Sequence, residues 1–411
     1  MDNKQGFRFT CSIDGKDLTD IPETSYGFSV RDSIHSFYSH LSFDLYDVGG
    51  IAQDNFLLCP GTKFNVKFGN VNEVKEFPSI IFSNGLQNKT SVQNLSGDMV
   101  YRGIHAFFLY DLPNSKGYQG SLSKIVKDKV ASLYSFKNLV IDNSSCDGIW
   151  YQRNFKYSEF MNEIILPNSF STEYDKDCPY FCYISYDNVF NYRNYKNFWT
   201  DNPVAEYSIY KTDLMQSYND ANNDNVKTSI YDYRNKKNVG INELDNNLET
   251  RYAYENQTAA EIINSDYSFE TSGYCPSSDR KIAIKDLNQG ITRIKYMGYD
   301  LSSDETYLEQ AQQGKRNYDY KDSLFQETFT LTMPYNPDLK SGKLIKLNVQ
   351  VKSPKDEDIL SVTYTDNYLI ETCTHNWIGK QSKAFTQVIV SRKFSKVKSD
   401  INIKDLLLAK K

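Results

Sequence analysis

A strand pattern that occurs twice, once near each end of the 411-residue chain, constrains the fold more than any other feature of the sequence. Each copy begins with a turn glycine, Gly61 or Gly342, and continues as a run in which apolar and polar residues alternate. Alternation at period two is typical of a half-buried strand. A second strand follows after a loop and leads into an aromatic-rich segment; the strand pairs cover 62–68 with 99–105, and 343–349 with 368–375. The sequence therefore predicts two similar β modules separated by a long middle segment.

The first module contains further strand signals. The segment 7–13 alternates at period two, and Asp14-Gly15 after it is a hairpin-turn signal. Other strands are predicted at 26–32, 41–47, 62–69 and 98–110. Five or six strands are enough for one small barrel or sandwich.

The pattern changes in the middle of the chain. Apolar residues recur at helical spacing over 120–136 and again over 157–165, where Pro167 closes the second helix. A short strand at 139–141 and a hairpin with its turn at Asp187-Asn188 complete a mixed α/β unit.

The later segments are more polar until the second module begins. Asn-rich strands are predicted within 203–240, a weakly patterned insert at 240–303, and a helix from Asp304 to about Phe325. The second module resumes at 329–333 and ends with 385–392, and a short helix with three leucines is predicted at 400–411. We expect an α+β, mostly β fold with five parts: 1–111 (first β-barrel), 112–202 (α/β domain), 203–240 with 304–398 (second β-barrel), 241–303 (inserted subdomain) and 399–411 (tail).

Charge and hydropathy exclude some functions. The net charge is −5, and no basic patch of the kind that grips a duplex is visible in the sequence. No stretch approaches the roughly 18 apolar residues of a membrane-spanning helix. Residues 1–6 lack the apolar core of a signal peptide, so we expect synthesis in a cytoplasm without export by the usual route.

A search for chemistry finds little. Cys178 and Cys182 are four residues apart, but no second pair accompanies them, so structural thiols are the favoured interpretation over a metal site. His105 and His375 lie at the same place in the two predicted strand pairs, which indicates equivalent strand ends and not two catalytic bases. The odd count of seven cysteines argues against a disulfide framework.

A calcium-loop pattern begins and then fails. Asp220, Asn222 and Asp224 suit its start, but Asn225 stands where glycine is needed and Tyr231 where the bidentate glutamate belongs. No phosphate-binding glycine loop and no nucleophile elbow occur in the sequence. We therefore predict no enzyme, with no catalytic, cofactor-binding or metal site.

The order of these pieces resembles the baseplate hub protein of contractile-tailed bacteriophages, whose fold also forms the N-terminal part of VgrG spike proteins. The likeness covers about 1–200 and 304–393, while 240–303 departs from it. The stretches that carry it are the opening strands 28–34 and 41–47, the Pro60-Gly61 strand, the helix start 150–161, the hairpin 181–192, and the closing-barrel strands 339–345 and 369–375. No lysozyme module or long β-helical spike follows, so we expect the spike to be a separate polypeptide.

The resemblance implies a structural function. Three subunits with two like tube-type barrels each would form a homotrimeric ring of near-sixfold symmetry, because head-to-tail packing of this kind can close. One face would seat a hexameric tail tube or its initiator and the other a trimeric central spike, with further baseplate proteins around them. The bore would let DNA pass, and a conduit should not bind its cargo tightly. The protein would then reside in the virion tail after assembly in the host cytoplasm.

Two other functions stay open from the sequence. A peripheral, receptor-binding tail protein is indicated by the abundance of tyrosine and asparagine, which suit sugar contacts. A polysaccharide hydrolase is indicated only by the many carboxylates, among which nothing singles out a catalytic pair.

Overall fold

The computed structural model describes the following residues, and the statements below concern these alone: 7–13, 16–17, 25–47, 59–70, 74–89, 97–145, 147–173, 178–210, 230, 232–237, 249–256, 261–265, 292–300, 314, 317–318, 321–325, 327–352, 358–360, 365–378 and 383–392. The fold is mostly β, as predicted. The segment 220–225, where the calcium-loop pattern begins and fails, and the predicted C-terminal tail 399–411 lie outside the described residues.

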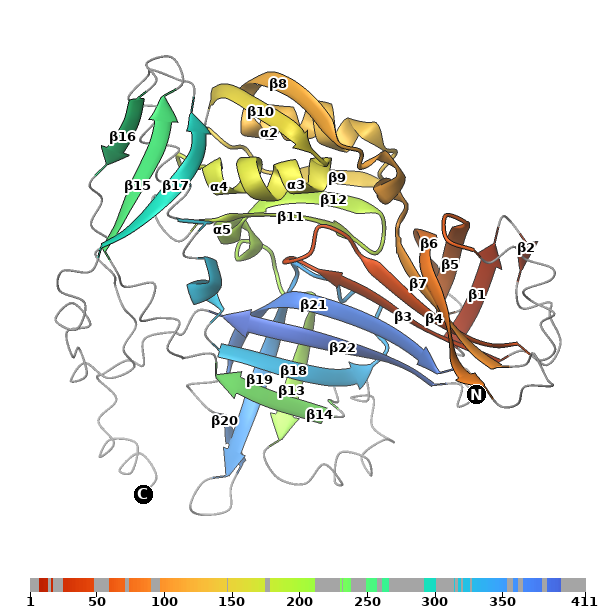
Figure 1. Ribbon diagram of the computed structural model, residues 1–411. Coiled ribbons are helices and arrows are strands. Elements are labelled where there is room, and N and C mark those ends of the chain that lie inside the picture. The colour runs from red at the N-terminus through yellow and green to blue at the C-terminus, as the bar shows by residue number, and fades with distance from the viewer. Residues whose placement is uncertain are drawn as a thin grey trace, which may run out of the picture.

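A single 14-stranded sheet contains both β modules (Figure 1). Its main path runs, in spatial order, through β14 (Asp232–Lys237), β18 (Glu327–Pro334), β22 (Lys383–Arg392), β21 (Asp366–Ile378), β3 (Ser25–Ser33), β4 (His40–Asp47), β7 (Gly97–His105), β6 (Val74–Lys89), β5 (Lys63–Asn70), β1 (Phe7–Ile13) and β2 (Lys16–Asp17). Beside β21 lies a branch of β19 (Leu344–Lys352), β13 (Ala205–Tyr210) and β20 (Asp358–Leu360). The modules are thus continuous with each other through backbone hydrogen bonds.

The two modules have the same topology. In the first, the spatial order is β5-β6-β7-β4-β3, and in the second it is β19-β21-β22-β18-β14. In both modules the chain passes through the five positions of the sheet in the same order. Every neighbouring pair of strands in both modules is antiparallel. The predicted internal repeat is therefore confirmed as a five-strand module present twice.

The turn glycines begin equivalent strands, as predicted. Gly61 N donates to the Ile81 oxygen at 2.8 Å, and Ile81 N donates back to Thr62. Gly342 N makes the same bond to the Ile370 oxygen at 2.8 Å, and Ile370 N donates back to Lys343. Both glycines have positive φ, 94° and 78°, which a residue with a side chain rarely adopts. A β-bulge directly follows each isoleucine in the ladder to the next strand.

The second strand of the repeat differs from the prediction. The partner of β5 is β6 and not the 99–105 strand, whereas the partner of β19 is the 368–375 strand, β21. His105 ends β7, whereas His375 lies inside β21, so the predicted equivalence of the two histidines is wrong. The pattern misled because Pro78 interrupts β6, and proline normally argues against a strand. It is tolerated because it lies beyond the last β6–β7 pair, Ser79 with His105.

Among the described strands, neither module forms a closed barrel. The described strands of both form the one open sheet, so the predicted pair of separate tube-type barrels is not found in the isolated subunit. The physical reason is β21, which is long enough to serve two neighbours on one edge. Its first half pairs with β19, and after the bulge at Ile370 to Thr372 its second half pairs with β3.

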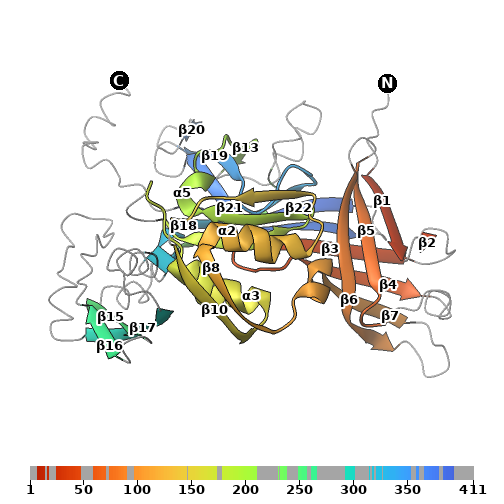
Figure 2. The same cartoon turned by 90° about the horizontal axis from the view of Figure 1, so that it is seen from above.

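An α/β unit lies on one side of this sheet (Figures 1 and 2). It has a two-stranded antiparallel sheet of β8 (Asn114–Ser121) and β10 (Asp147–Phe155), and a three-stranded sheet of β11 (Tyr180–Ser185), β12 (Val189–Asn194) and β9 (Asn138–Ile141). The two predicted helices are present with tightened and widened turns: α2 (Leu122–Ile125), η4 (Val126–Val130) and η5 (Ala131–Leu133) form the first, and α3 (Tyr157–Phe160), η6 (Met161–Ile165) and α4 (Leu166–Asn168) the second.

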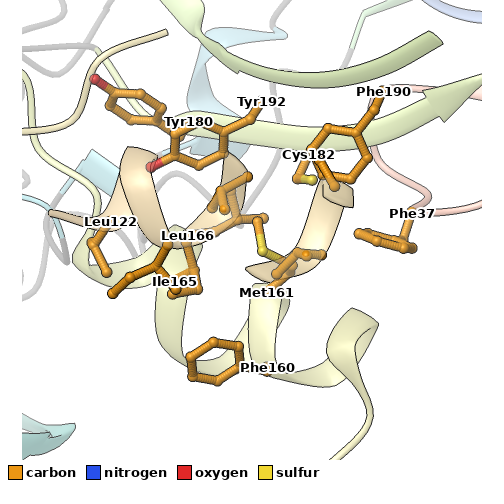
Figure 3. Packing of buried hydrophobic residues seen from close by; sticks show 14 of the residues in the cluster. Phe37, Leu122, Phe160, Met161, Ile165, Leu166, Tyr180, Cys182, Phe190 and Tyr192 are labelled. Atoms are coloured by element: carbon orange, nitrogen blue, oxygen red, sulfur yellow. The ribbon is translucent and has the colours of Figure 1, made fainter. Parts of the chain in front are cut away.

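The core of this unit explains why these helices form. Their apolar stripes pack on one another and on the inner faces of β11 and β12, with Phe160, Met161 and Ile165 fully buried (Figure 3). Every residue of β11 and β12 is buried, so the hairpin that these two strands form is covered on both faces. Short helices connect this unit to the main sheet. η3 (Ala106–Tyr110) lies between β7 and β8, and α5 (Tyr195–Phe198) lies between β12 and β13.

The polar insert contains a separate small sheet. Its order is β16 (Glu261–Ser265), β15 (Glu249–Asn256) and β17 (Thr292–Asp300), with β15 antiparallel to β16 and parallel to β17. The predicted helix over 304–325 is represented by the short η9 (Lys321–Leu324) and helical residues at 314 and 317–318. Among the described helices, none is long and apolar enough to cross a membrane.

Candidate functional site

The turn between β11 and β12 inserts where the two modules meet, and we call Tyr186, Asp187 and Asn188 the junction turn. Asn188 adopts a positive φ of 62°, which asparagine tolerates and which lets the hairpin reverse tightly. Each of the three residues bonds a different part of the main sheet or its loops. The sequence predicts this turn but not its contacts.

Asp32 on β3 is the buried centre of the junction. Its Oδ1 accepts from Ser341 Oγ at 2.9 Å and from Ser341 N at 3.4 Å, and its Oδ2 accepts from Tyr186 N at 3.3 Å. The side chain is 0% exposed. Burial raises the pKa of Asp32 to about 7, despite the hydrogen bonds that lower it. One carboxyl thus joins the first module, the second module and the α/β unit.

Around Asp32, the junction turn makes further bonds to the loop that precedes β19. Asp187 Oδ2 pairs with Lys340 Nζ at 2.7 Å, and Tyr186 Oη donates to the Pro337 oxygen at 2.8 Å. Burial alone would raise the pKa of Asp187, but the charge and hydrogen bond of Lys340 outweigh it and hold that pKa below its ordinary value.

His375 is enclosed in the same junction. Its ring centroid lies 4.8 Å from that of Tyr186 and 5.8 Å from that of Phe68. The ring donates from Nε2 to the Leu339 oxygen at 3.1 Å and meets Thr386 Oγ1 with Nδ1 at 3.1 Å. Burial lowers the pKa of His375 to about 4, so it is a neutral packing residue at physiological pH.

His105 fastens the first module to the other end of the junction turn. Phe107 N donates to its Nδ1 at 3.1 Å, so Nε2 carries the proton and donates to Asn188 Oδ1 at 3.2 Å. Burial lowers the pKa of His105 also to about 4. Both histidines are therefore buried and neutral at physiological pH, and they occupy different positions in the two modules.

The two cysteines weighed as metal ligands are buried apart from any ligand set. Cys178 accepts from Asn317 Nδ2 at 3.1 Å, and Cys182 lies in the α/β core beside Phe190 (Figure 3). Burial raises the pKa of Cys182 well above its ordinary value, so it stays a thiol. Within the described ranges, no cluster of three or more His, Cys, Asp or Glu side chains could hold a metal ion.

The arrangement can fix the geometry between two modules. Polar groups that are buried and fully hydrogen-bonded specify one packing, because any other leaves a donor or acceptor unpaired. Sequence reasoning missed Asp32, Ser341 and Lys340 because each belongs to an ordinary polar position of a strand or turn. The one available signal was the closeness of the Asp187-Asn188 turn to two strands rich in aromatic residues, 180–185 and 189–194.

Comparisons with known proteins bear on the fold. No family model and no curated protein matches this sequence. Among solved structures, the tail protein from Neisseria meningitidis MC58 is similar with a TM-score of 0.53 and 11% identity, covering 94% of this chain and 96% of that one. The 43 kDa tail protein of prophage MuSo2 from Shewanella oneidensis has a TM-score of 0.50 and 9% identity, covering 94% and 98%. The predicted resemblance to tail proteins is confirmed at the level of fold.

Proposed function

We propose that this chain is a structural component of a phage tail baseplate, namely a trimeric hub that joins a sixfold tail tube to a threefold central spike. The observation that carries the proposal is the five-strand module present twice in one sheet. Three such chains offer six similar modules, so a ring of them matches a hexameric partner while keeping the symmetry of a trimeric one. The domain division predicted from the sequence belongs to this proposal.

The buried junction supports this function because an adaptor must hold its two modules at a fixed angle. Asp32, Ser341 and Tyr186 form a three-way contact that no flexible linker replaces. The fold shared with two tail proteins over nearly their whole length supports the same class of function. In this proposal the tube, the spike and other baseplate proteins are partners, and DNA passes through the bore without being gripped.

The alternative of a peripheral receptor-binding protein receives less support. It was motivated by the many tyrosines and asparagines, but seven of the 32 tyrosines fill cores instead of presenting rings at a surface. The fully buried tyrosines include Tyr101, Tyr180, Tyr183, Tyr186, Tyr192, Tyr207 and Tyr368. These seven rings pack in the interior and cannot contact a glycan, and glycan-array binding by the isolated chain would support the alternative.

The test is the oligomeric state and shape of the purified full chain. We expect mass photometry to give three times the mass of the 47.5 kDa chain, and negative-stain images to show a ring with a central hole. A monomer at micromolar concentration that also fails to associate with tube or spike protein refutes the hub.

A further inference from the structure

The β21–β3 contact joins the two modules within the chain, and the described strands form no such contact at the other ends of the modules. It consists of antiparallel pairs from Thr372 with Ser33 to Ile378 with Gly27. By the topology of the repeat, β6 is the counterpart of β21 and β14 is the counterpart of β3. Of the described strands, only β7 pairs with β6 beyond its bulge, and only β18 pairs with β14. Each chain therefore presents one half of this contact at each end.

We propose that the free edge of β6 pairs with β14 of a second copy, so that the junction between subunits repeats the junction within the subunit. This inference rests on the proposed trimeric hub and names its subunit interface. The contact is head-to-tail, because each copy gives a β6 edge to one neighbour and a β14 edge to the other. Such a contact closes into a ring when the rotation per copy divides a full turn.

The repeat also fixes the register of the proposed pairing. Ile81 and Ile370 are equivalent, and stepping across the ladders from them reaches Val30 in the first module and Asn235 in the second. Within the chain, Val30 pairs with His375. The position equivalent to His375 on β6 is Leu86. The register between copies therefore places Leu86 opposite Asn235, with Gly85 opposite Lys236 and Asn84 opposite Lys237.

The side chain at the β6 bulge supports a protein partner at this edge. At the equivalent bulge, the backbone oxygen of Glu371 accepts from Ile34 N at 2.9 Å, and its carboxylate meets His35 Nε2 at 2.7 Å. That bulge is covered by the chain's own β3 end. Phe82 occupies the bulge of β6 and is 57% exposed, with its ring centroid 6.1 Å from that of Phe108.

Phe82 belongs to a wider apolar surface. Phe108 lies on η3, and the exposed side chains on and just after that helix are Leu109, Tyr110 and Leu112. An exposed group of large apolar residues beside an open strand edge is typical of an interface. A second copy is the occupant that the molecule itself indicates, because the complementary edge is β14 of the same chain and the intrachain junction shows how the two fit.

Disulfide trapping in the full chain tests the register. The background carries Cys59→Ser, because Cys59 is an exposed free cysteine. In Leu86→Cys/Asn235→Cys, mild oxidation should give covalent dimers and trimers on a non-reducing gel, because facing Cβ atoms in a sheet lie about 5 Å apart. The matched control, Leu86→Cys/Asp232→Cys, moves one thiol roughly 10 Å along β14 and should cross-link far less.

A second variant tests the interface without cross-links. Phe82→Glu should raise the dissociation constant of the trimer about 30-fold or more, since a charge replaces a buried apolar anchor. The circular dichroism spectrum should not change, because the ring is exposed in the isolated subunit. The control is Ile149→Glu, which alters an equally apolar residue, 41% exposed, on β10; we expect the trimer to persist.

The possible failures are distinguishable. If the wild-type chain is a trimer but neither the Leu86–Asn235 pair cross-links nor Phe82→Glu weakens it, the interface is wrong and the hub proposal stands. Equal cross-linking of the in-register and shifted pairs also overturns the register. If the wild-type chain is a monomer under all conditions, both proposals are refuted.

Discussion

The repeat provides its own control for a stability experiment at the two turn glycines. Gly61 and Gly342 make the same backbone bonds and both have positive φ, so replacing either by alanine imposes a similar backbone cost. For an alanine in the left-handed region this is about 1–2 kcal/mol, partly offset by the lower entropy of the unfolded chain. We expect Gly61→Ala to cost about 1 kcal/mol, because a Cβ there meets nothing within 4 Å.

Gly342→Ala should cost considerably more. A Cβ at this position would lie 2.0 Å from the Tyr183 hydroxyl and 2.9 Å from Phe198 Cε1. Tyr183 is 1% exposed and its hydroxyl donates to the Ser341 oxygen at 3.2 Å, so it cannot move away without losing that bond. Overpacking of about 1–3 kcal/mol and a lost hydrogen bond of about 1 kcal/mol add to the backbone cost. Together with the backbone cost of about 1 kcal/mol, the total is about 3–5 kcal/mol.

The assay is urea unfolding followed by tryptophan and tyrosine fluorescence. The midpoint urea concentration of the same unfolding transition is compared between Gly61→Ala and Gly342→Ala. Adding Tyr183→Phe to Gly342→Ala should recover part of the loss, because it removes the atom closest to the new Cβ. The ring contacts near 3 Å remain, so recovery is incomplete. If Gly342→Ala costs no more than Gly61→Ala, the packing argument is refuted.

Three further predictions concern titratable side chains, two at buried positions and one at the surface. Asp32 has a folded pKa of about 7, above its unfolded value near 4, so the folded state binds the extra proton between them and stability falls as pH rises through this window. Asp32→Asn should remove a pH-dependent loss of roughly 3 kcal/mol between pH 4.5 and pH 7.5, measured by urea unfolding at these two pH values. Arg392→Met should cost about 3–5 kcal/mol, because Glu327, 0% exposed and 2.7 Å from Arg392 Nε, would keep a buried charge unpaired. Lys346→Met, at the exposed pair with Glu206, should leave the melting temperature unchanged, and an equal loss in both variants would contradict the burial argument.

Elements with a clear period were predictable from the sequence. The predicted strands at 7–13, 26–32, 41–47 and 62–69, the two helical stripes and the β11–β12 hairpin occur where the apolar spacing placed them, and the predicted strand 98–110 ends at His105. The stripes depended on residues such as Phe160 and Ile165, which are buried because they share one helical face. Local periodicity decides such elements, so tertiary context does not override it.

The pairing of strands was not predictable to the same extent. β6 carries Pro78 and two bulges, which hide its period, so β7 was matched to β21 in its place. The sheet is continuous because β21 pairs with both β19 and β3 along one edge. The residues around the Ile370 bulge carry no sequence pattern that predicts this double pairing. The junction depended on Asp32 meeting Ser341, residues separated by most of the chain, and no local pattern encodes such a contact.

The places where the repeat has diverged indicate what each copy does. By its position in the strand ladder, Arg392 in the second module is the equivalent of His105 in the first. The two side chains bond different partners: His105 bonds Asn188 of the junction turn, and Arg392 pairs with the buried Glu327. At the bulges, Glu371 meets His35 within the chain, whereas Phe82 remains exposed. The two modules thus share backbone bonds and differ at the contacts that distinguish their surroundings. If a second copy covers Phe82, this difference is the one that a ring with true threefold and approximate sixfold symmetry requires, because alternate junctions in it lie within and between chains.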